Sequence, residues 1–448
     1  MNTTAMKPFK TFLLPLLLLF TTLLAACGGG GGGSSPAAAT YSVVYSANGS
    51  TGGAVPSGDT KAYAASSTAT VLGNTGALVK TGYVFTGWNT AANGSGTAYA
   101  AGASLAVGSG SVTLYAAWVR QFTQVTTLAG TAGSGGSADG TGTAALFNGP
   151  SGVATGGTNL YVADSSSGTI RKLVIATGAV TTLAGSADGT GYVDGTGAAA
   201  RFYLPNGITT DGTNLYVADS GNSTIRKVVI ATGVVSTLAG TARSEGSTDG
   251  TGTAARFKNP GGVATDGTNL YVTDGGNSTI RKVVIATGVV TTLVGTAGSS
   301  GSTDDTGAAA RFDSPKGITT DGTNLYVTDG GNSTIRKVVI ATGVVTTLAG
   351  TAGSSGSTDG TGTGALFGYP QGITTDGSNL YVTDALNTIR KVVIATGVVT
   401  TLAGTAGSNG SADGTGAAAR FYGPNGVTTD GTNLYVADTF NYTVRKLQ

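Results

Sequence analysis

Apolar and polar residues alternate in short runs over most of this chain. The stretches "NLYVAD" (214–219) and "TIRKVVIA" (224–231) are typical of these runs, and such alternation is the pattern of half-buried β-strands. Each run ends at a turn signal, such as the Asp-Gly of "DGTN" (211–214) or the Thr-Gly of "ATG" (231–233). The apolar stripes with a period of 3.6 that helices need are absent from these runs. The pattern therefore predicts an all-β protein.

The pattern repeats six times along most of the chain. Each copy holds four predicted strands, of which "GITT", "NLYVAD", "STIRKVVIA" and "VVSTLAG" are examples. The copies begin at Val125, Val180, Val235, Val290, Val345 and Val399. Four antiparallel strands joined by tight turns form a propeller blade, and a period of this size is typical of such arrays. We predict a six-bladed β-propeller over residues 121–448.

The frame of the repeat predicts how the propeller closes. The last copy ends with "NYTVRKLQ" (441–448), its third strand, and lacks the "VTTLAG" that would be its fourth. An additional "VTTLAG" (125–130) precedes the first blade. We expect this strand to complete the last blade, because pairing the two ends removes open sheet edges.

A smaller all-β domain is predicted at residues 41–119. Runs such as "YVFTGWN" (83–89) and "VTLYAAWV" (112–119) are separated by turn residues. The two tryptophans of the chain, Trp88 and Trp118, both lie here. A domain this small needs large buried side chains, so we expect the tryptophans in its core. An exposed tryptophan surface for a sugar ring is the alternative.

Residues 1–26 have the pattern of a signal peptide. Lys7 and Lys10 precede the apolar stretch "TFLLPLLLLFTTLLAA", which is short for a membrane span. Cys27, the single cysteine of the chain, follows it directly. Residues 27–40 are Gly-rich and are expected to act as a flexible tether. An ordinary secretory signal with an incidental cysteine is the alternative to a lipid-modified Cys27.

Composition narrows the chemistry. The chain of 448 residues contains no histidine, so catalytic triads that need imidazole and metal sites that contain histidine are excluded. It has 24 basic and 22 acidic residues, and removing residues 1–26 takes away two lysines, which leaves 22 of each. A neutral protein has no basic field for nucleic acid. We therefore expect no cofactor, no nucleic-acid partner and no enzymatic activity.

Residues present in every blade are expected to be scaffold. The Asp after each "LYV" is expected to cap its loop or to pair with the following Arg, and a ring-shaped ion site is the alternative. Examples of these pairs are Asp219 with Arg226, Asp274 with Arg281 and Asp329 with Arg336. The acids of the "DGTG" segments are interpreted as turn formers, with a calcium site as the alternative. These acids are Asp139, Asp194, Asp249, Asp304, Asp359 and Asp413. The phenylalanines of the "ARF" segments are expected to pack between blades, and examples are Phe202, Phe257 and Phe312.

Residues that differ between blades concentrate where each long inter-blade loop enters the innermost strand. These positions are expected to ring one mouth of the central channel, and loops on a rigid scaffold commonly bind ligands. Tyr, Lys and Gln suit polar partners such as glycans or protein loops. The predicted ligand-binding residues are Tyr203, Lys258, Lys316, Tyr369, Gln371 and Tyr422. Drift between duplicated blades is the alternative.

Three segments resemble known families. "NLYVADSGNSTIRK" and its copies (125–448) resemble NHL repeats, which implies a six-bladed propeller that binds proteins, nucleic acids or glycans. "TGYVFTGWNTAANGSGTAYAAG" with "LYAAW" is similar to the internalin B-repeat of bacterial surface proteins, which implies a β-grasp-like spacer. "LLAAC" (23–27) resembles a lipobox, which implies a diacylglycerol on Cys27, and the absence of Asp at position 28 resembles an outer-membrane or surface destination.

Together these observations predict a monomeric, lipid-anchored protein of the bacterial cell envelope that binds a protein or glycan or serves as a scaffold. A few NHL-like propellers are lyases, but they use histidines that this chain lacks. Two alternatives stay open. One is a carboxylate-dependent lyase or glycosidase, for which Glu245 and Asp313 are the acids that break the repeat. The other is a purely structural surface component.

Overall fold

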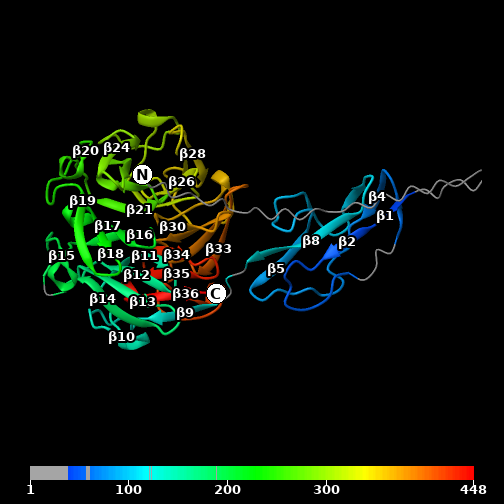
Figure 1. The fold of residues 1–448 in the computed structure, drawn as a ribbon, viewed down its shortest axis with the longest axis horizontal. Coiled ribbons are helices and arrows are strands. Elements are labelled where there is room, and N and C mark those ends of the chain that lie inside the picture. Colours follow the sequence, from blue (N-terminus) through cyan, green and yellow to red (C-terminus); the bar gives the residue numbers. More distant parts are fainter. Residues whose placement is uncertain (1–38, 57–60, 121, 123, 188) are drawn as a thin grey trace, which may run out of the picture. The chain divides into compact units, whose positions relative to one another are not determined.

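The computed structural model describes residues 39–448 except 57–60, 121, 123 and 188 (Figure 1). The predicted signal peptide, Cys27 and almost all of the predicted tether lie outside the described residues. Within the described part, no helix has both the length and the apolar character needed to cross a bilayer. The chain divides into two compact units, one built mainly from residues before Trp118 and the other containing Trp118–Gln448.

The smaller unit is a compact set of short strands. Its main sheet has the order β2-β8-β5-β6, in which β2 and β8, the second and last strands of the domain, run parallel, as in a β-grasp. The strands are β1 (Thr40–Tyr41), β2 (Val43–Ser46), β3 (Tyr63–Ala64), β4 (Ser67–Thr70), β5 (Tyr83–Asn89), β6 (Ala98–Tyr99), β7 (Ser104–Val107) and β8 (Val112–Arg120). Trp88 is fully buried, and its indole N–H donates to the Leu72 carbonyl at 2.8 Å. Trp118 is only half-buried, so the expectation of two core tryptophans is confirmed for Trp88 alone.

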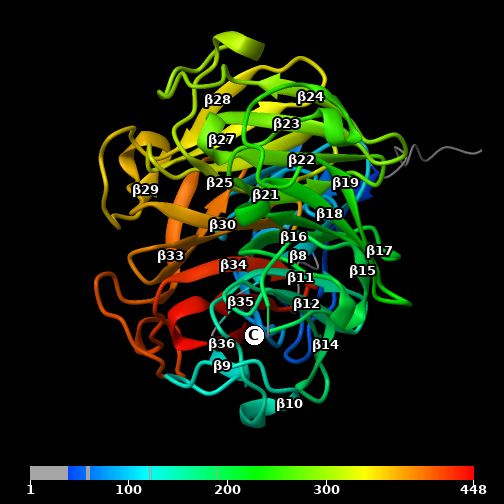
Figure 2. The same ribbon diagram turned by 90° about the vertical axis from the view of Figure 1, so that its left-hand side faces the viewer.

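The larger unit is a six-bladed β-propeller. The first blade runs outward from β11 (Pro150–Gly156) through β12 (Asn159–Asp164) and β13 (Thr169–Val174) to β14 (Ala179–Gly185). Each inner strand contacts the inner strands of both neighbouring blades, and the last contacts the first. Figure 2 shows these six inner strands around the middle of the propeller: β11, β16, β21, β25, β30 and β34.

The other blades repeat this order of strands. Their strands, from the inside outward, are β16 (Pro205–Thr210), β17 (Asn214–Asp219), β18 (Thr224–Val229) and β19 (Val234–Ala239); β21 (Pro260–Thr265), β22 (Asn269–Asp274), β23 (Thr279–Val284) and β24 (Val289–Val294); β25 (Pro315–Thr320), β26 (Asn324–Asp329), β27 (Thr334–Val339) and β28 (Val345–Ala349); β30 (Pro370–Thr375), β31 (Asn379–Asp384), β32 (Thr388–Val393) and β33 (Val398–Gly404); and β34 (Pro424–Thr429), β35 (Leu434–Asp438), β36 (Thr443–Leu447) and β9 (Val125–Ala129).

The two ends of the propeller segment meet in one sheet, as the frame of the repeat predicted. The register pairs Val444 with Ala129 and Leu447 with Val125. Figure 1 shows β9, in cyan, beside β36, in red. The closure leaves every blade with four long strands.

Short elements on the outer edge were not predicted. In four blades a two-residue strand adds to the outermost strand as a fifth strand. These strands are β10 (Gly140–Thr141), β15 (Gly195–Thr196), β20 (Gly250–Thr251) and β29 (Gly360–Thr361). Six 3₁₀ turns lie at the equivalent place of each copy: Gly142–Ala144, Gly197–Ala199, Gly252–Ala254, Gly307–Ala309, Gly362–Gly364 and Gly416–Ala418. Three more lie in the loops after the second strands of three blades: Ser220–Asn222, Gly275–Asn277 and Thr439–Asn441.

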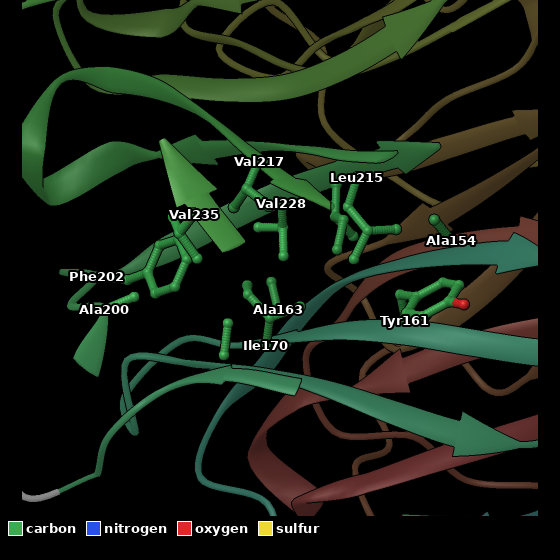
Figure 3. Packing of buried hydrophobic residues seen from close by; sticks show 12 residues of the cluster. Ala154, Tyr161, Ala163, Ile170, Ala200, Phe202, Leu215, Val217, Val228 and Val235 are labelled. Carbon is green, nitrogen blue, oxygen red and sulfur yellow. The ribbon is translucent and has the colours of Figure 1, made fainter. Parts of the chain in front are cut away.

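The hydrophobic cores lie between neighbouring blades. One cluster joins Ala163 and Ile170 of the first blade to Val217 and Val228 of the second, with Phe202 packed among them (Figure 3). Equivalent clusters contain the phenylalanines of the other copies. The prediction that these phenylalanines pack between blades is confirmed. Because each core is shared, no blade can be removed without exposing apolar surface on two others.

A buried ion network recurs in every blade. In the second blade, Arg226 donates from Nη1 to Asp219 Oδ2 at 2.9 Å and from Nη2 to Asp194 Oδ1 at 2.6 Å. Its guanidinium lies 5.0 Å from the centre of the Phe202 ring. The arginines at the centre of these networks are all fully buried: Arg171, Arg226, Arg281, Arg336, Arg390 and Arg445. The predicted pairing of the Asp after "LYV" with the following Arg is thus confirmed.

The interpretation of the "DGTG" acids as turn formers is wrong for their carboxylates. Asp194 accepts hydrogen bonds from Arg226, from the Thr237 hydroxyl at 3.1 Å and from the Thr237 amide at 3.0 Å. The acid therefore attaches the long inter-blade segment to the outer strands of its blade. Sequence spacing could not show this, because Asp194 and Arg226 lie 32 residues apart.

Candidate ligand-binding mouth

Six glycines line the central channel just below one mouth. At each of them an added Cβ would lie 2.1–2.6 Å from a backbone carbonyl oxygen of the next blade, so only glycine fits. These are Gly152, Gly207, Gly262, Gly317, Gly372 and Gly426. Beneath them lie six buried Val and Ile side chains: Val153, Ile208, Val263, Ile318, Ile373 and Val427. The glycine ring and this apolar layer line the channel directly under the mouth and are here called its floor.

The residue before each of these glycines lines the mouth above the floor. The six residues are Ser151, Asn206, Gly261, Lys316, Gln371 and Asn425. Of the predicted ligand-binding residues, Lys316 and Gln371 belong to this ring. Five of the six ring residues are uncharged, and the sixth is Lys316.

Three predicted residues come together at the fourth and fifth blades. Lys316 Nζ lies 5.5 Å from the centre of the Tyr369 ring, which is a cation–π arrangement. Gln371 donates from Nε2 to the Tyr369 carbonyl oxygen at 3.2 Å. Tyr369 has a φ of 58° and remains 41% exposed. The cluster presents an ammonium, an amide and an aromatic ring side by side.

The other three predicted residues lie in separate copies around the mouth. Tyr203 is 41% exposed and packs against Gly221, where an added Cβ would lie 2.4 Å from its ring. Tyr422 is 43% exposed and contacts Phe440, with ring centres 5.1 Å apart. Lys258 Nζ lies 3.9 Å from Glu245 Oε2. The six predicted residues therefore surround the mouth and do not converge on one point.

The loops between the second and third strands also reach this mouth, although none of their residues was among those predicted to bind a ligand. Ser220, Gly275 and Gly276 line a pocket with Lys316, and Phe440 is 57% exposed beside Tyr422. The order of the strands could have predicted this position, because consecutive antiparallel strands run in opposite directions. The loop after the second strand must then lie on the same face as the loop that enters the first.

The buried acids hold the mouth loops in place. Asp219 Oδ1 accepts the backbone N–H of Tyr203 at 2.8 Å, while its Oδ2 accepts from Asn222 and Arg226. The equivalent acid in every other blade accepts the backbone N–H at the position of Tyr203. The first variable residue of each mouth loop is thus bonded to an invariant buried group.

Burial changes the ionisation of these acids. It raises the pKa of Asp164, Asp219 and Asp329 to about 6, although hydrogen bonds and the nearby arginines act in the opposite direction. Burial also raises the pKa of the three equivalent acids, Asp274, Asp384 and Asp438. Within the described residues, no group of three or more His, Cys, Asp or Glu side chains is placed to hold a metal ion.

The fold and the mouth define a class, a six-bladed β-propeller with a loop-built surface at one mouth of its central channel, joined to a small β-domain. Residues 41–117 match the Listeria–Bacteroides repeat domain family. Over 144 residues the chain is 38% identical to NHL repeat-containing protein 2 of Homo sapiens, which covers 30% of this chain and 20% of that protein. Over 280 residues it is 30% identical to Protein SUPPRESSOR OF QUENCHING 1, chloroplastic, of Arabidopsis thaliana, which covers 58% of this chain and 26% of that protein.

The protein is thus an NHL-type β-propeller preceded by a bacterial surface repeat domain. The chain spans about a quarter or less of the length of these curated relatives. An auxiliary nutrient binding protein from Bacteroides ovatus has a similar fold, with a TM-score of 0.55 and 17% identity over 85% of this chain and 82% of that one. At this identity the likeness is one of fold.

Proposed function

We propose that the protein is a lipid-anchored binding or scaffold protein of the bacterial cell envelope, whose long-loop mouth binds a polar partner. The partner is a protein segment or a glycan. The observation that carries the proposal is a contrast within the mouth. Exposed Tyr203, Tyr369 and Tyr422 occupy positions whose residue type changes from blade to blade, whereas the floor beneath them hardly varies. Aromatic rings with a polar group, held on a rigid scaffold, bind partners at low entropic cost.

The proposed location in the cell envelope is supported by the two domains and by the segment that precedes them. Residues 41–117 match the Listeria–Bacteroides repeat domain and resemble the internalin B-repeat of bacterial surface proteins, and a fold neighbour from Bacteroides is named an auxiliary nutrient binding protein. The lipobox-like segment before Cys27 supports attachment through lipid to the outer membrane or cell surface. The Gly-rich segment after it would hold the domains away from the bilayer.

The proposal is one of binding without turnover. The mouth has few acids besides the six buried ones, and the two that break the repeat have protein partners. Glu245 lies beside Lys258, and Asp313 accepts a hydrogen bond from the Ser314 hydroxyl at 3.1 Å. A glycosidase needs two carboxyl groups facing one bond, and the known partners of these two acids do not favour that role.

The test uses the full chain purified in detergent on an array of bacterial and host glycans, with immobilised envelope proteins as a second panel. We expect saturable binding to one class of partner. The triple variant Tyr203→Ala, Tyr369→Ala, Tyr422→Ala should lose at least tenfold in affinity with an unchanged melting temperature. The matched control is the double variant Val234→Ala, Val344→Ala. Both valines are exposed and lie on the face of the propeller opposite the mouth, so this variant should bind normally. Full binding by the triple variant, or turnover of a glycoside, would overturn the proposal.

A further inference from the structure

The mouth is not sixfold symmetric, because the third blade lacks a side chain at the ring position where each of the other five blades has one. Position 261 in the mouth ring is glycine, whereas the five equivalent residues carry side chains. The following loop has Gly275 and Gly276, as the fourth blade has Gly330 and Gly331, whereas the second blade has a serine and the sixth a threonine and a phenylalanine there. These absences leave a pocket of about 220 Å³, here called the blade-3 hollow.

Polar side chains of the second, third and fourth blades line the hollow. They are Asn206, Ser220, Asn259, Ser314 and Lys316. Among the described residues, none hydrogen-bonds the side-chain amides of Asn206 and Asn259. Ser220 donates to the Pro260 carbonyl oxygen, and Ser314 donates to Asp313. The two amides are therefore available to a ligand, and the two hydroxyls can still accept.

Lys316 is the cation of the hollow. It is half-buried, and within the described part of the chain no carboxylate lies within 4.0 Å of its ammonium. The other mouth lysine, Lys258, faces Glu245, and the six arginines on the third strands of the blades are buried and paired with aspartates. The Tyr369 ring beside Lys316 restrains the ammonium without neutralising it. A half-buried cation without an acid favours an anionic ligand group.

We propose that the blade-3 hollow binds a carboxylate-bearing sugar ring, of the hexuronic acid class, at the end or within a chain of an acidic glycan. The sugar carboxylate contacts Lys316 Nζ, and the ring hydroxyls bond to the amides of Asn206 and Asn259. The hollow is smaller than the roughly 300 Å³ at which pockets for drug-sized ligands begin, so it suits a single ring. This inference rests on the proposed function and names the ligand class of the same mouth.

The experiment titrates the full chain with methyl glucuronide, methyl glucoside and inorganic phosphate, using calorimetry or NMR shifts. We expect methyl glucuronide to bind at least tenfold more tightly than methyl glucoside, and more tightly than phosphate. Lys316→Gln keeps most of the side-chain length and should abolish this preference. Lys282→Gln is the matched control, since that lysine pairs with Tyr271 near the end of β23 that lies opposite the mouth, and it should change nothing.

A second variant tests the hollow itself. Gly261→Asn places there the residue that the second and sixth blades already carry, so the fold should persist with an unchanged melting temperature. It should abolish glucuronide binding by filling the space. Equal affinity for the acidic and neutral sugars, a preference that survives Lys316→Gln, or phosphate binding as tight as glucuronide would each overturn the inference. If glucuronide fails while the tyrosine variant still loses its partner, the inference falls and the proposed function stands.

Discussion

The inside of the blades and the mouth above them differ in how far the six copies agree in sequence. Inside, six copies of the same arginine, two aspartates and phenylalanine repeat with almost the same geometry, and ion-pair distances lie between 2.6 and 3.5 Å. At the mouth, the six equivalent positions carry serine, asparagine, glycine, lysine, glutamine and asparagine. The two regions are joined directly, because each inner aspartate accepts the N–H of the first variable residue in its mouth loop.

This difference separates what holds the propeller together from what it presents. Changing an inner residue should alter stability, while changing a mouth residue should alter binding and leave stability within about 0.5 kcal/mol. A single chain that carries six copies offers internal controls for both statements.

The largest expected effect comes from pH, because burial raises the pKa of all six inner acids. Burial raises the pKa of Asp164, Asp219 and Asp329 to about 6, above the ordinary value of 3.8. Between these values the folded state binds more protons than the unfolded state, so stability should rise as pH falls from 7 towards 4.5. Each pKa unit corresponds to ~1.4 kcal/mol per group. The chain has no histidine to titrate in this window.

Below pH 4 the trend should reverse. Hydrogen bonds from Asn214, Thr213 and Tyr216 outweigh burial and lower the pKa of Asp211 to about 2, and the same direction holds at the equivalent acids of four more blades. These acids stabilise the fold above 3.8 and lose that contribution as pH falls through their folded values. Urea unfolding from pH 3 to 8 should show a maximum between 4 and 5. Stability that is flat or falling from pH 7 to 5 would show that the inner acids stay ionised.

The next effect is confined to one blade. Arg281 is fully buried and bonds to Asp274 at 2.9 Å and to Asp249 at 2.6 Å. Arg281→Met should cost about 3–5 kcal/mol, since it leaves Asp274 buried without its cation. Adding Asp274→Leu should recover part of this loss but not all, because Asp274 also accepts the Lys258 N–H. Lys258→Ala, at the mouth, should cost less than 0.5 kcal/mol. A loss below 1 kcal/mol for Arg281→Met in urea unfolding would mean that the ion network is not what stabilises the blade.

Much of the interior could be predicted from sequence because it repeats. The Asp–Arg pairs such as Asp219 and Arg226 are seven residues apart on paired strands, and the closing strand was visible from the frame of the repeat. The role of Asp194 was missed because its partner lies in another part of the copy. At the mouth, sequence variation located the region, and the loops reaching it from between the second and third strands were overlooked. The hollow could not be foreseen, since a pocket made by absent side chains has no residue to mark it.

In every blade a side-chain hydroxyl donates a hydrogen bond to the next blade, but the residue that supplies the hydroxyl differs. In the third, fourth and fifth blades, the threonine before the inner aspartate donates to a carbonyl oxygen of the next blade; Thr273, for example, donates to the Lys316 oxygen at 2.6 Å. The second and sixth blades have alanine there. In them a hydroxyl after the aspartate, from Ser220 or Thr439, donates instead to the next inner strand. The first blade uses Ser151.

The smallest expected effect comes from moving this hydroxyl, within the third blade, from the position before the inner aspartate to the position after it. Thr273→Ala should cost about 1 kcal/mol, the usual net value of one hydrogen bond. Gly275 occupies the place that Ser220 has in the second blade, and both begin a 3₁₀ turn, Ser220–Asn222 and Gly275–Asn277. A Cβ at Gly275 would lie 3.2 Å from the Pro315 oxygen, the equivalent of the Pro260 oxygen that Ser220 bonds. Adding Gly275→Ser to Thr273→Ala should therefore restore most of the stability in urea unfolding. If Gly275→Ser stabilises the wild-type and the Thr273→Ala background equally, the two hydroxyls are independent and do not replace one another as the junction between blades.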